Sequence, residues 1–126
     1  MRILLDTHVF LWSVKDDRRL SKATKRLILE ADDVYISSAS IWELAIKIKV
    51  KKLSLDIDQL KSSIVDSDFL ELPVTAHHAA KVAHLPLLHR DPFDRILIAQ
   101  AICEPLIFLT ADQTLKDYSN LVQVID

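Results

Sequence analysis

The sequence predicts an α/β protein: a three-layer α/β/α sandwich with helices on both faces of a mostly parallel central sheet. Two continuous apolar runs, at 3–5 and 106–110, are too short to cross a membrane and too unbroken for half-exposed strands. Such runs are typical of strands that are buried on both faces. Strand-like and helix-like segments also alternate along the chain, as they do where crossover helices join parallel strands. At 126 residues, we expect a single domain over 1–126.

The first half of the chain predicts two strands and four helices. Each helix follows a residue whose side-chain oxygen can accept a hydrogen bond from the first turn, such as Thr7 or Ser21. Apolar residues then recur at helical spacing, which is typical of helices that pack on a sheet. The expected elements are a strand at 3–5, helices at 8–14 and 22–31, a strand at 34–37, a helix from Ser38 or Ser40 to about Val50, and a helix from Asp56 or Asp58 through Val65.

The second half predicts three strands and two helices, with prolines near their ends. Pro73 has no N–H for a ladder hydrogen bond and therefore favours an edge strand or a strand end. Asp91 is a good N-cap, and Pro92 takes the first helical position, where a backbone N–H is not needed. The expected elements are a strand at 69–74, a helix from Thr75 to about His84, a helix from Asp91 that ends before Pro105, and strands at 106–110 and 121–125.

Charge and cysteine content restrict the class of protein. A net charge of −2 means that any nucleic acid must be bound by a local patch rather than by bulk charge. The single Cys103 cannot form an internal disulfide, which favours a reducing compartment. The apolar start breaks at Asp6, and no stretch approaches about 18 uninterrupted apolar residues, so we expect neither a signal-peptide core nor a membrane span. These features favour a cytoplasmic protein.

The chain contains no glycine. This excludes glycine-rich phosphate loops and dinucleotide-binding fingerprints, because both need backbone conformations that only glycine adopts freely. The ends of the helices must also be closed by Asn, Asp or solvent instead of the usual glycine.

Asp94 is the most informative single residue. On the expected helix it shares a face with Leu97, Ile98 and Ala101, at the spacing of a stripe that points into a core. A carboxylate in such a place needs compensation by a cation, a metal or a mouth open to water. The simpler interpretation is an acid in the first turn, which the helix dipole favours.

Three other acids occupy related positions. Asp6 and Asp112 each follow a buried strand, and Glu43 lies near the start of a helix that follows a strand. Singly, each has an ordinary interpretation: a cap or turn acid for the two aspartates, and an ion pair with Lys47 for Glu43. Together with Asp94, they all fall at the carboxyl ends of parallel strands, where α/β sheets place their ligands. We therefore expect the four carboxylates to converge.

Converging carboxylates repel one another unless divalent cations neutralise them. Oxygen ligands without Cys or paired His favour Mg²⁺ or Mn²⁺ over Zn²⁺. Such a site suits phosphodiester hydrolysis, since a bound metal activates water and stabilises developing negative charge. Thr110, two residues before Asp112, can add a hydroxyl that orients a carboxylate or a water.

Four segments give the chain a resemblance to a known family. They are LLDTHVFLW, SIWELAIK, HRDPFDRILIAQA and LTAD, and they sample the chain from residue 3 to residue 112. In this order and spacing the chain resembles the PIN-domain ribonucleases, in particular the VapC-like toxins of bacterial toxin–antitoxin pairs. It departs from many relatives in having no glycine near Lys51, and in having Glu104–Pro105 before the last core strand.

The resemblance implies a PIN-like fold and a set of functional residues. It implies that Asp6, Glu43, Asp94 and Asp112 are the catalytic, metal-binding acids, with Thr110 in support. It also implies Mg²⁺- or Mn²⁺-dependent endonucleolytic cleavage of RNA, held in check by a cognate antitoxin protein.

Two other interpretations compete with a nuclease. One is a catalytically silent PIN-like module that binds RNA or protein without cutting. The other is a phosphatase with Asp6 as nucleophile, similar to the haloacid dehalogenase-like enzymes. Those enzymes need a second Asp two residues on, where this chain has His8.

Basic and aromatic residues suggest where partners bind. Two basic clusters are either solvated faces or contacts to RNA phosphates: Arg18, Arg19, Lys22, Lys25 and Arg26, and Lys47, Lys49, Lys51 and Lys52. His89 and Arg90 are better placed for a phosphate contact, just before the helix that carries Asp94. Apolar surface around Trp42 and Ile46 is expected to bind a second copy, in a homodimer, or the antitoxin.

Overall fold

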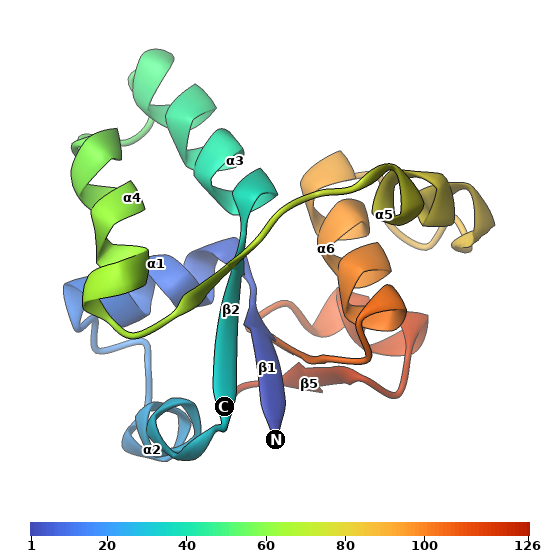
Figure 1. Cartoon of the computed structure of the whole chain (residues 1–126), viewed down its shortest axis with the longest axis horizontal. Helices are drawn as coiled ribbons and strands as arrows, with labels where there is room; N and C mark the ends of the chain where they lie inside the picture. The colour runs from blue at the N-terminus through green and yellow to red at the C-terminus, as the bar shows by residue number, and fades with distance from the viewer.

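The computed structural model describes all residues 1–126 and contains one sheet of five parallel strands. The order across the sheet is β3-β2-β1-β4-β5, so β1 lies in the centre. The strands are β1 (Arg2–Leu5), β2 (Asp33–Ser37), β3 (Leu70–Leu72), β4 (Ile107–Thr110) and β5 (Val122–Val124). In register, Ile3 lies opposite Val34 on one side and Ile107 on the other. Helices flank the sheet (Figure 1), which confirms the predicted fold class, and β3 occupies an edge, as Pro73 predicted.

The helices lie close to their predicted positions. They are α1 (Thr7–Lys15), α2 (Lys22–Glu30), α3 (Ser38–Lys49), α4 (Ile57–Asp66), α5 (Ala76–Lys81), η1 (Val82–His84), α6 (Pro92–Cys103) and η2 (Gln113–Tyr118). The expected caps Ser21, Asp56, Thr75 and Asp91 each accept a hydrogen bond from the following turn. The short 3₁₀ helix η2 was not predicted.

Two caps differ from the prediction. Asp6, and not Thr7, is the N-cap of α1: its Oδ1 accepts a hydrogen bond from the Thr7 N–H at 2.7 Å. Likewise Ser37, and not Ser38 or Ser40, is the N-cap of α3, because its hydroxyl accepts from the Ala39 N–H at 3.0 Å. Asp6 is the one residue between β1 and α1, and Ser37 is the last residue of β2, so each strand passes into its helix through the capping residue alone.

The hydrophobic core lies on both faces of the sheet. Ile3 and Leu5 point into the layer formed with α1, α2, α3 and α4, whereas Leu4 points into the layer formed with α6 and η2. Figure 1 shows α1, α2 and α4 on one side of β1 and β2, and α5 and α6 on the other. All three side chains are fully buried, and burial of each stabilises the fold by about 1.5–3 kcal/mol. This fixes the carboxyl end of β1 in the middle of the molecule. None of the helices combines the length and apolarity that a membrane crossing requires.

The glycine-free turns use left-handed backbone at charged residues. Asp16 (φ 50°) and Asp68 (φ 61°) follow the ends of α1 and α4, as the expectation of Asn or Asp allowed. Lys51, with φ 63°, follows α3 and is neither. A side chain with a Cβ makes this conformation unfavourable by about 1–2 kcal/mol. Lys51 is therefore a position where the fold is less stable than it would be with glycine.

Candidate active site

Asp6 stands at the carboxyl end of β1 and is held by two hydrogen bonds. Its Oδ1 accepts from the Thr7 N–H at 2.7 Å, and its Oδ2 accepts from the Thr110 hydroxyl at 2.5 Å. The two residues meet because β1 and β4 are neighbouring strands. Burial raises the pKa of Asp6, although both hydrogen bonds and the charge of His8 lower it, and the charge of Glu43 raises it further. The two hydrogen bonds therefore fix the orientation of a buried carboxylate at the carboxyl end of β1.

Thr110 connects Asp6 to Asp112. While its hydroxyl donates to Asp6, the same oxygen accepts a hydrogen bond from the Asp112 N–H at 3.0 Å. Asp112 caps η2 through Oδ1, which accepts from the amide and the hydroxyl of Thr114. Burial raises the pKa of Asp112, but the Thr114 hydrogen bonds and the charges of His89 and His8 outweigh it, so its pKa lies below its usual value. The other oxygen, Oδ2, has no hydrogen bond within the protein and is available to a ligand.

Asp94 lies in the first turn of α6 and is the acid in the least favourable surroundings. Its side chain is only 17% exposed, and its carboxylate accepts no hydrogen bond from the protein. Burial, followed by the charges of Asp6, Asp91, Glu43 and Asp112, raises the pKa of Asp94 to about 7. The charges of the three other acids that the sequence singled out therefore all reach Asp94, and Asp91, expected only as a cap, adds to them.

Glu43 forms the ion pair that was its simpler interpretation, and its role as a metal-site acid stays a prediction. Its Oε2 pairs with Lys47 Nζ at 3.0 Å, one helical turn along α3. Its charge nevertheless raises the pKa of Asp6 and of Asp94. Glu43 therefore lies near the other acids while its own charge is partly compensated by Lys47.

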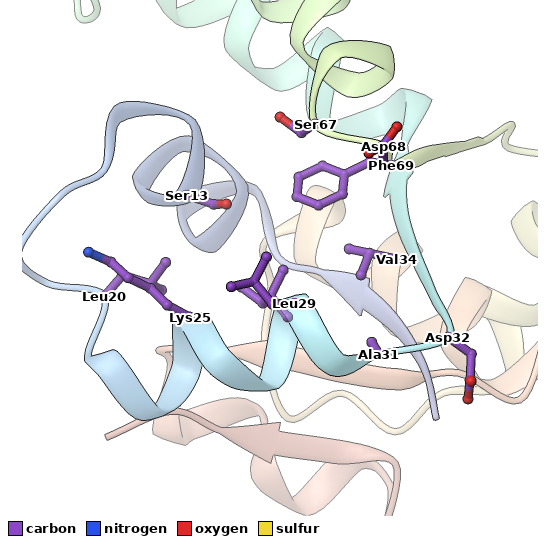
Figure 2. A pocket seen from close by; sticks show the side chains of 11 residues that line it. Ser13, Leu20, Lys25, Leu29, Ala31, Asp32, Val34, Ser67, Asp68 and Phe69 are labelled. Atoms are coloured by element: carbon purple, nitrogen blue, oxygen red, sulfur yellow. The ribbon is translucent and has the colours of Figure 1, made fainter.

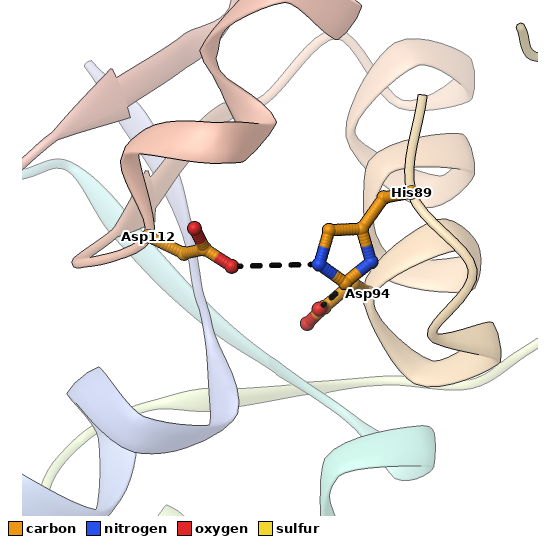
Figure 3. Close-up of side chains that lie close together, drawn as sticks. All are labelled: His89, Asp94 and Asp112. Carbon is orange, nitrogen blue, oxygen red and sulfur yellow. Dashed lines mark ion pairs between the residues drawn. The ribbon is translucent and has the colours of Figure 1, made fainter. Parts of the chain in front are cut away.

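His89 lies between two of the acids, as Figure 3 shows. Its Nδ1 is 3.7 Å from Asp94 Oδ2, and its Nε2 is 3.7 Å from Asp112 Oδ2. One atom from each of these three residues lies within 4.8 Å of the others, close enough to surround a single ion. The sequence associated His89 and Arg90 with a phosphate contact. The structure places His89 at the acids and leaves Arg90 exposed.

Two residues that hold the segment next to the acids were not predicted from the sequence. Arg95 is buried, and its guanidinium donates to backbone carbonyls and to the hydroxyl of Tyr118. Both residues hold the segment that carries His89, since the Tyr118 hydroxyl accepts from the His89 N–H at 2.7 Å. The sequence feature that could have indicated the burial of Arg95 is the nearly continuous apolar run from Ile96 to Ile102. A helix that is apolar all round is buried all round.

Two hollows lie apart from this arrangement. A cavity of about 380 Å³ between α1, α2 and the start of β2 is lined by residues that include Leu29, Val34 and Phe69 (Figure 2), and none of the four acids lines it. A larger apolar groove of about 700 Å³ runs between α3, α5 and α6, and includes Trp42 and Ile46. Trp42 is 64% exposed, so it forms part of an apolar surface, as expected from the sequence.

The basic clusters are partly engaged in local ion pairs. Arg19 pairs with Asp17 at 2.8 Å, and Lys25 pairs with Asp16 at 2.6 Å. These contacts agree with solvated faces, and a role for either cluster in binding RNA stays a prediction.

The donor set fits a hard divalent cation. Carboxylate oxygens of Asp94 and Asp112 lie within 4.8 Å of each other, whereas Asp6 and Glu43 lie outside this group and act on Asp94 only through their charges. Asp112 Oδ2 accepts no hydrogen bond from the protein. Oxygen donors in this number suit Mg²⁺ or Mn²⁺, whereas Zn²⁺ favours Cys and His. The arrangement can therefore hold a divalent ion next to a polar, partly open surface.

Comparison with known proteins gives concordant matches. A family model described as the PIN domain matches residues 3–121. The chain is 30% identical over 120 residues to Ribonuclease VapC22 of Mycobacterium tuberculosis, a match that covers 94% of this chain and 92% of that protein. VapBC2 from Rickettsia felis, solved bound to a DNA fragment from its promoter, has a TM-score of 0.72 at 21% identity, over 97% of this chain and 96% of that one. DNA-bound VapBC from Salmonella typhimurium has a TM-score of 0.69 at 17% identity, over 100% and 98%. These structures share the fold.

Proposed function

Because the chain belongs to the PIN-domain family, we propose that it is a metal-dependent endoribonuclease toxin that is neutralised by a cognate antitoxin. The observation that carries this proposal is Asp94, a partly buried carboxylate without a hydrogen-bond donor, whose pKa three other candidate site acids help to raise to about 7. Such an arrangement is unfavourable in a protein that binds no cation. Perturbed acids of this kind are typical of functional sites.

Each residue has a distinct role in the proposed reaction. Asp6, Asp94 and Asp112 would hold Mg²⁺ or Mn²⁺, with Glu43 as a further acid at the site. When bound, the ion would activate a water for attack on the RNA phosphodiester and stabilise the negative charge that develops. Thr110 fixes the Asp6 carboxylate and the Asp112 backbone, so that the acids from β1 and β4 keep their spacing. A bound cation would favour the ionised form of Asp94, because it would offset the neighbouring charges that favour the protonated form.

Protein partners would use the apolar surface. The solved relatives include VapBC complexes and a toxin–antitoxin complex from Klebsiella pneumoniae, which supports an antitoxin as partner. The groove around Trp42 and Ile46 offers a surface for a second copy of the chain or for the antitoxin. A homodimer would run as one species of twice the monomer mass in light scattering, and Trp42→Ser would shift it toward monomer. An RNA substrate and a free cysteine both fit a cytoplasmic location.

The test is RNA cleavage by purified protein. Wild type and Asp6→Asn, prepared in parallel, are incubated with an RNA panel in Mn²⁺ or in EDTA. We expect cleavage only by wild type with metal, because the variant loses one carboxylate at the centre of the site. The exposed acid variant Asp117→Asn serves as the matched control and should cleave like wild type. Cleavage that persists in EDTA would point to a contaminating ribonuclease. Mn²⁺-dependent cleavage by both Asp6→Asn and Asp94→Asn at the rate of wild type would contradict the assignment. Metal binding without cleavage of any RNA would favour the silent binding module.

A further inference from the structure

The backbone around His89 determines which ring nitrogen carries the hydrogen. The Asp91 N–H donates to His89 Nδ1 at 3.1 Å, so Nδ1 presents a lone pair and the hydrogen is on Nε2. Asp91 in turn caps α6, accepting from the Phe93 N–H at 2.9 Å. The turn that leads into α6 therefore fixes the tautomer of His89 as well as its position.

This tautomer makes His89 a poor metal ligand. A histidine binds a metal through a nitrogen lone pair. The lone pair on Nδ1 is used by Asp91, and Nε2 carries the hydrogen instead. The Nε2–H faces Asp112 Oδ2, but at 3.7 Å the two atoms are too far apart for a hydrogen bond. His89 thus presents an N–H donor that has no acceptor within the protein, next to the acids, and its side chain is partly open to solvent.

A buried cation holds the segment that carries His89. Arg95 Nη1 donates to Pro86 O at 2.9 Å and to the Tyr118 hydroxyl at 3.2 Å, and its Nη2 donates to Val82 O at 3.1 Å. The Tyr118 hydroxyl accepts from the His89 N–H. One guanidinium therefore ties η1, the segment before α6 and η2 together, and Asp112 caps that same η2.

Arg95 has no carboxylate partner to offset its burial. It is 8% exposed, and the carbonyls and the phenol that accept from its Nη1 and Nη2 do not neutralise its charge. A buried charge without a counter-ion is costly, and an apolar residue of similar size often fits such a place as well or better for stability. A role in fixing the segment that carries His89 therefore explains a buried arginine at this position better than a contribution to core stability does.

We propose that His89 is a substrate-contacting residue, whose Nε2–H donates a hydrogen bond to a non-bridging oxygen of the RNA phosphate at the acid site, and that Arg95 positions it. This rests on the proposed function. A cluster of carboxylates repels a phosphodiester. The Nε2–H of His89 offsets part of this repulsion, because it donates a hydrogen bond to one phosphate oxygen and keeps its hydrogen. The contact adds to substrate binding and orientation, and it leaves metal binding to the carboxylates.

The test separates substrate contact from metal ligation at His89. Cleavage kinetics with a defined RNA and Mn²⁺ affinity by calorimetry are measured for wild type, His89→Ala and His89→Gln, with the exposed His84→Ala as matched control. We expect His89→Ala to lower kcat/KM about 10- to 100-fold while the Mn²⁺ Kd stays within about twofold. His89→Gln keeps an N–H close to the place of Nε2 and should recover most of the activity. A weaker Mn²⁺ Kd in both variants, or full activity in His89→Ala, would overturn the proposal.

The positioning role of Arg95 is tested through coupling. Arg95→Met should lower kcat/KM as His89→Ala does, and the double variant should be no worse than either single variant, because both remove the same contact. Independent, multiplying losses would contradict it. If Arg95→Met does not fold, Tyr118→Phe removes the hydroxyl that takes the His89 N–H and serves the same comparison. If wild type itself cuts no RNA, the proposed function fails, and the substrate contact of His89 fails with it.

Discussion

Replacement of Asp94 by Asn should stabilise the metal-free protein, by an amount that grows as the pH rises above about 4. The pKa of Asp94 is raised to about 7 in the folded protein, from the ordinary value of 3.8 for a free aspartate side chain. Between these values the folded state binds a proton that the unfolded chain has lost, so stability falls as pH rises from about 4 to about 7. Asn does not titrate, so the stability of the variant should not show this decrease with pH.

The size of the effect follows from the two pKa values. The difference between about 7 and 3.8, at about 1.36 kcal/mol for each pH unit, sets an upper limit of about 4 kcal/mol. Since the side chain keeps some contact with water, which screens the neighbouring charges, we expect about 1–2 kcal/mol. The variant should therefore equal wild type near pH 4 and exceed it by that amount at pH 8.

Urea unfolding followed by circular dichroism measures this directly. Wild type, Asp94→Asn and the exposed control Asp117→Asn are unfolded in EDTA at pH 4.5, 6 and 8. Only Asp94→Asn should gain stability relative to wild type as the pH rises. A variant that is less stable than wild type at pH 8, or a difference that does not change with pH, would refute the reasoning, because the acids would then not repel one another at Asp94.

Two further changes probe the hydrogen bonds of Thr110 and the turn at Lys51. Thr110→Val should lower the free energy of unfolding by about 1–3 kcal/mol, because the Asp6 carboxylate and the Asp112 N–H both lose their hydrogen-bond partner. Thr110→Ser keeps the hydroxyl and should keep most of the wild-type stability. Equal stability of Thr110→Val and wild type in urea would contradict this. Lys51→Gly should raise the melting temperature by an amount equivalent to about 1 kcal/mol, since glycine adopts positive φ without strain. The control Lys52→Gly should not raise it. A loss of stability in Lys51→Gly would count against the left-handed turn.

The sequence predicted the parts of the fold that depend on local pattern. The unbroken runs at 3–5 and 106–110 became the neighbouring strands β1 and β4, and their ends placed Asp6 and Thr110 together. The spacing of Asp94 with its apolar neighbours likewise predicted a carboxylate on the buried side of α6. These inferences succeeded because strand burial and helix periodicity are properties of short segments.

Other features depended on contacts that no local pattern contains. Adjacent residues with similar capping ability, such as Asp6 and Thr7, differ only in the backbone they adopt, so the cap was assigned one residue late. The tautomer of His89 depends on one backbone N–H, and the role of Arg95 depends on segments brought together by the fold. Such residues look like ordinary surface charges until the segment before α6 is placed against η2.

The most direct test of the central claim is the effect of Mn²⁺ on thermal unfolding of wild type and Asp94→Asn at pH 8. At about 100 times its Kd, the ion should stabilise wild type by roughly 2.7 kcal/mol, or about 10 °C for a domain of this size. We expect Asp94→Asn to gain much less at the same Mn²⁺ concentration, because it lacks one of the carboxylates that hold the ion. An equal shift in both proteins would place the ion elsewhere. No shift in either would mean that these four acids are caps and ion-pair partners, and not a metal site.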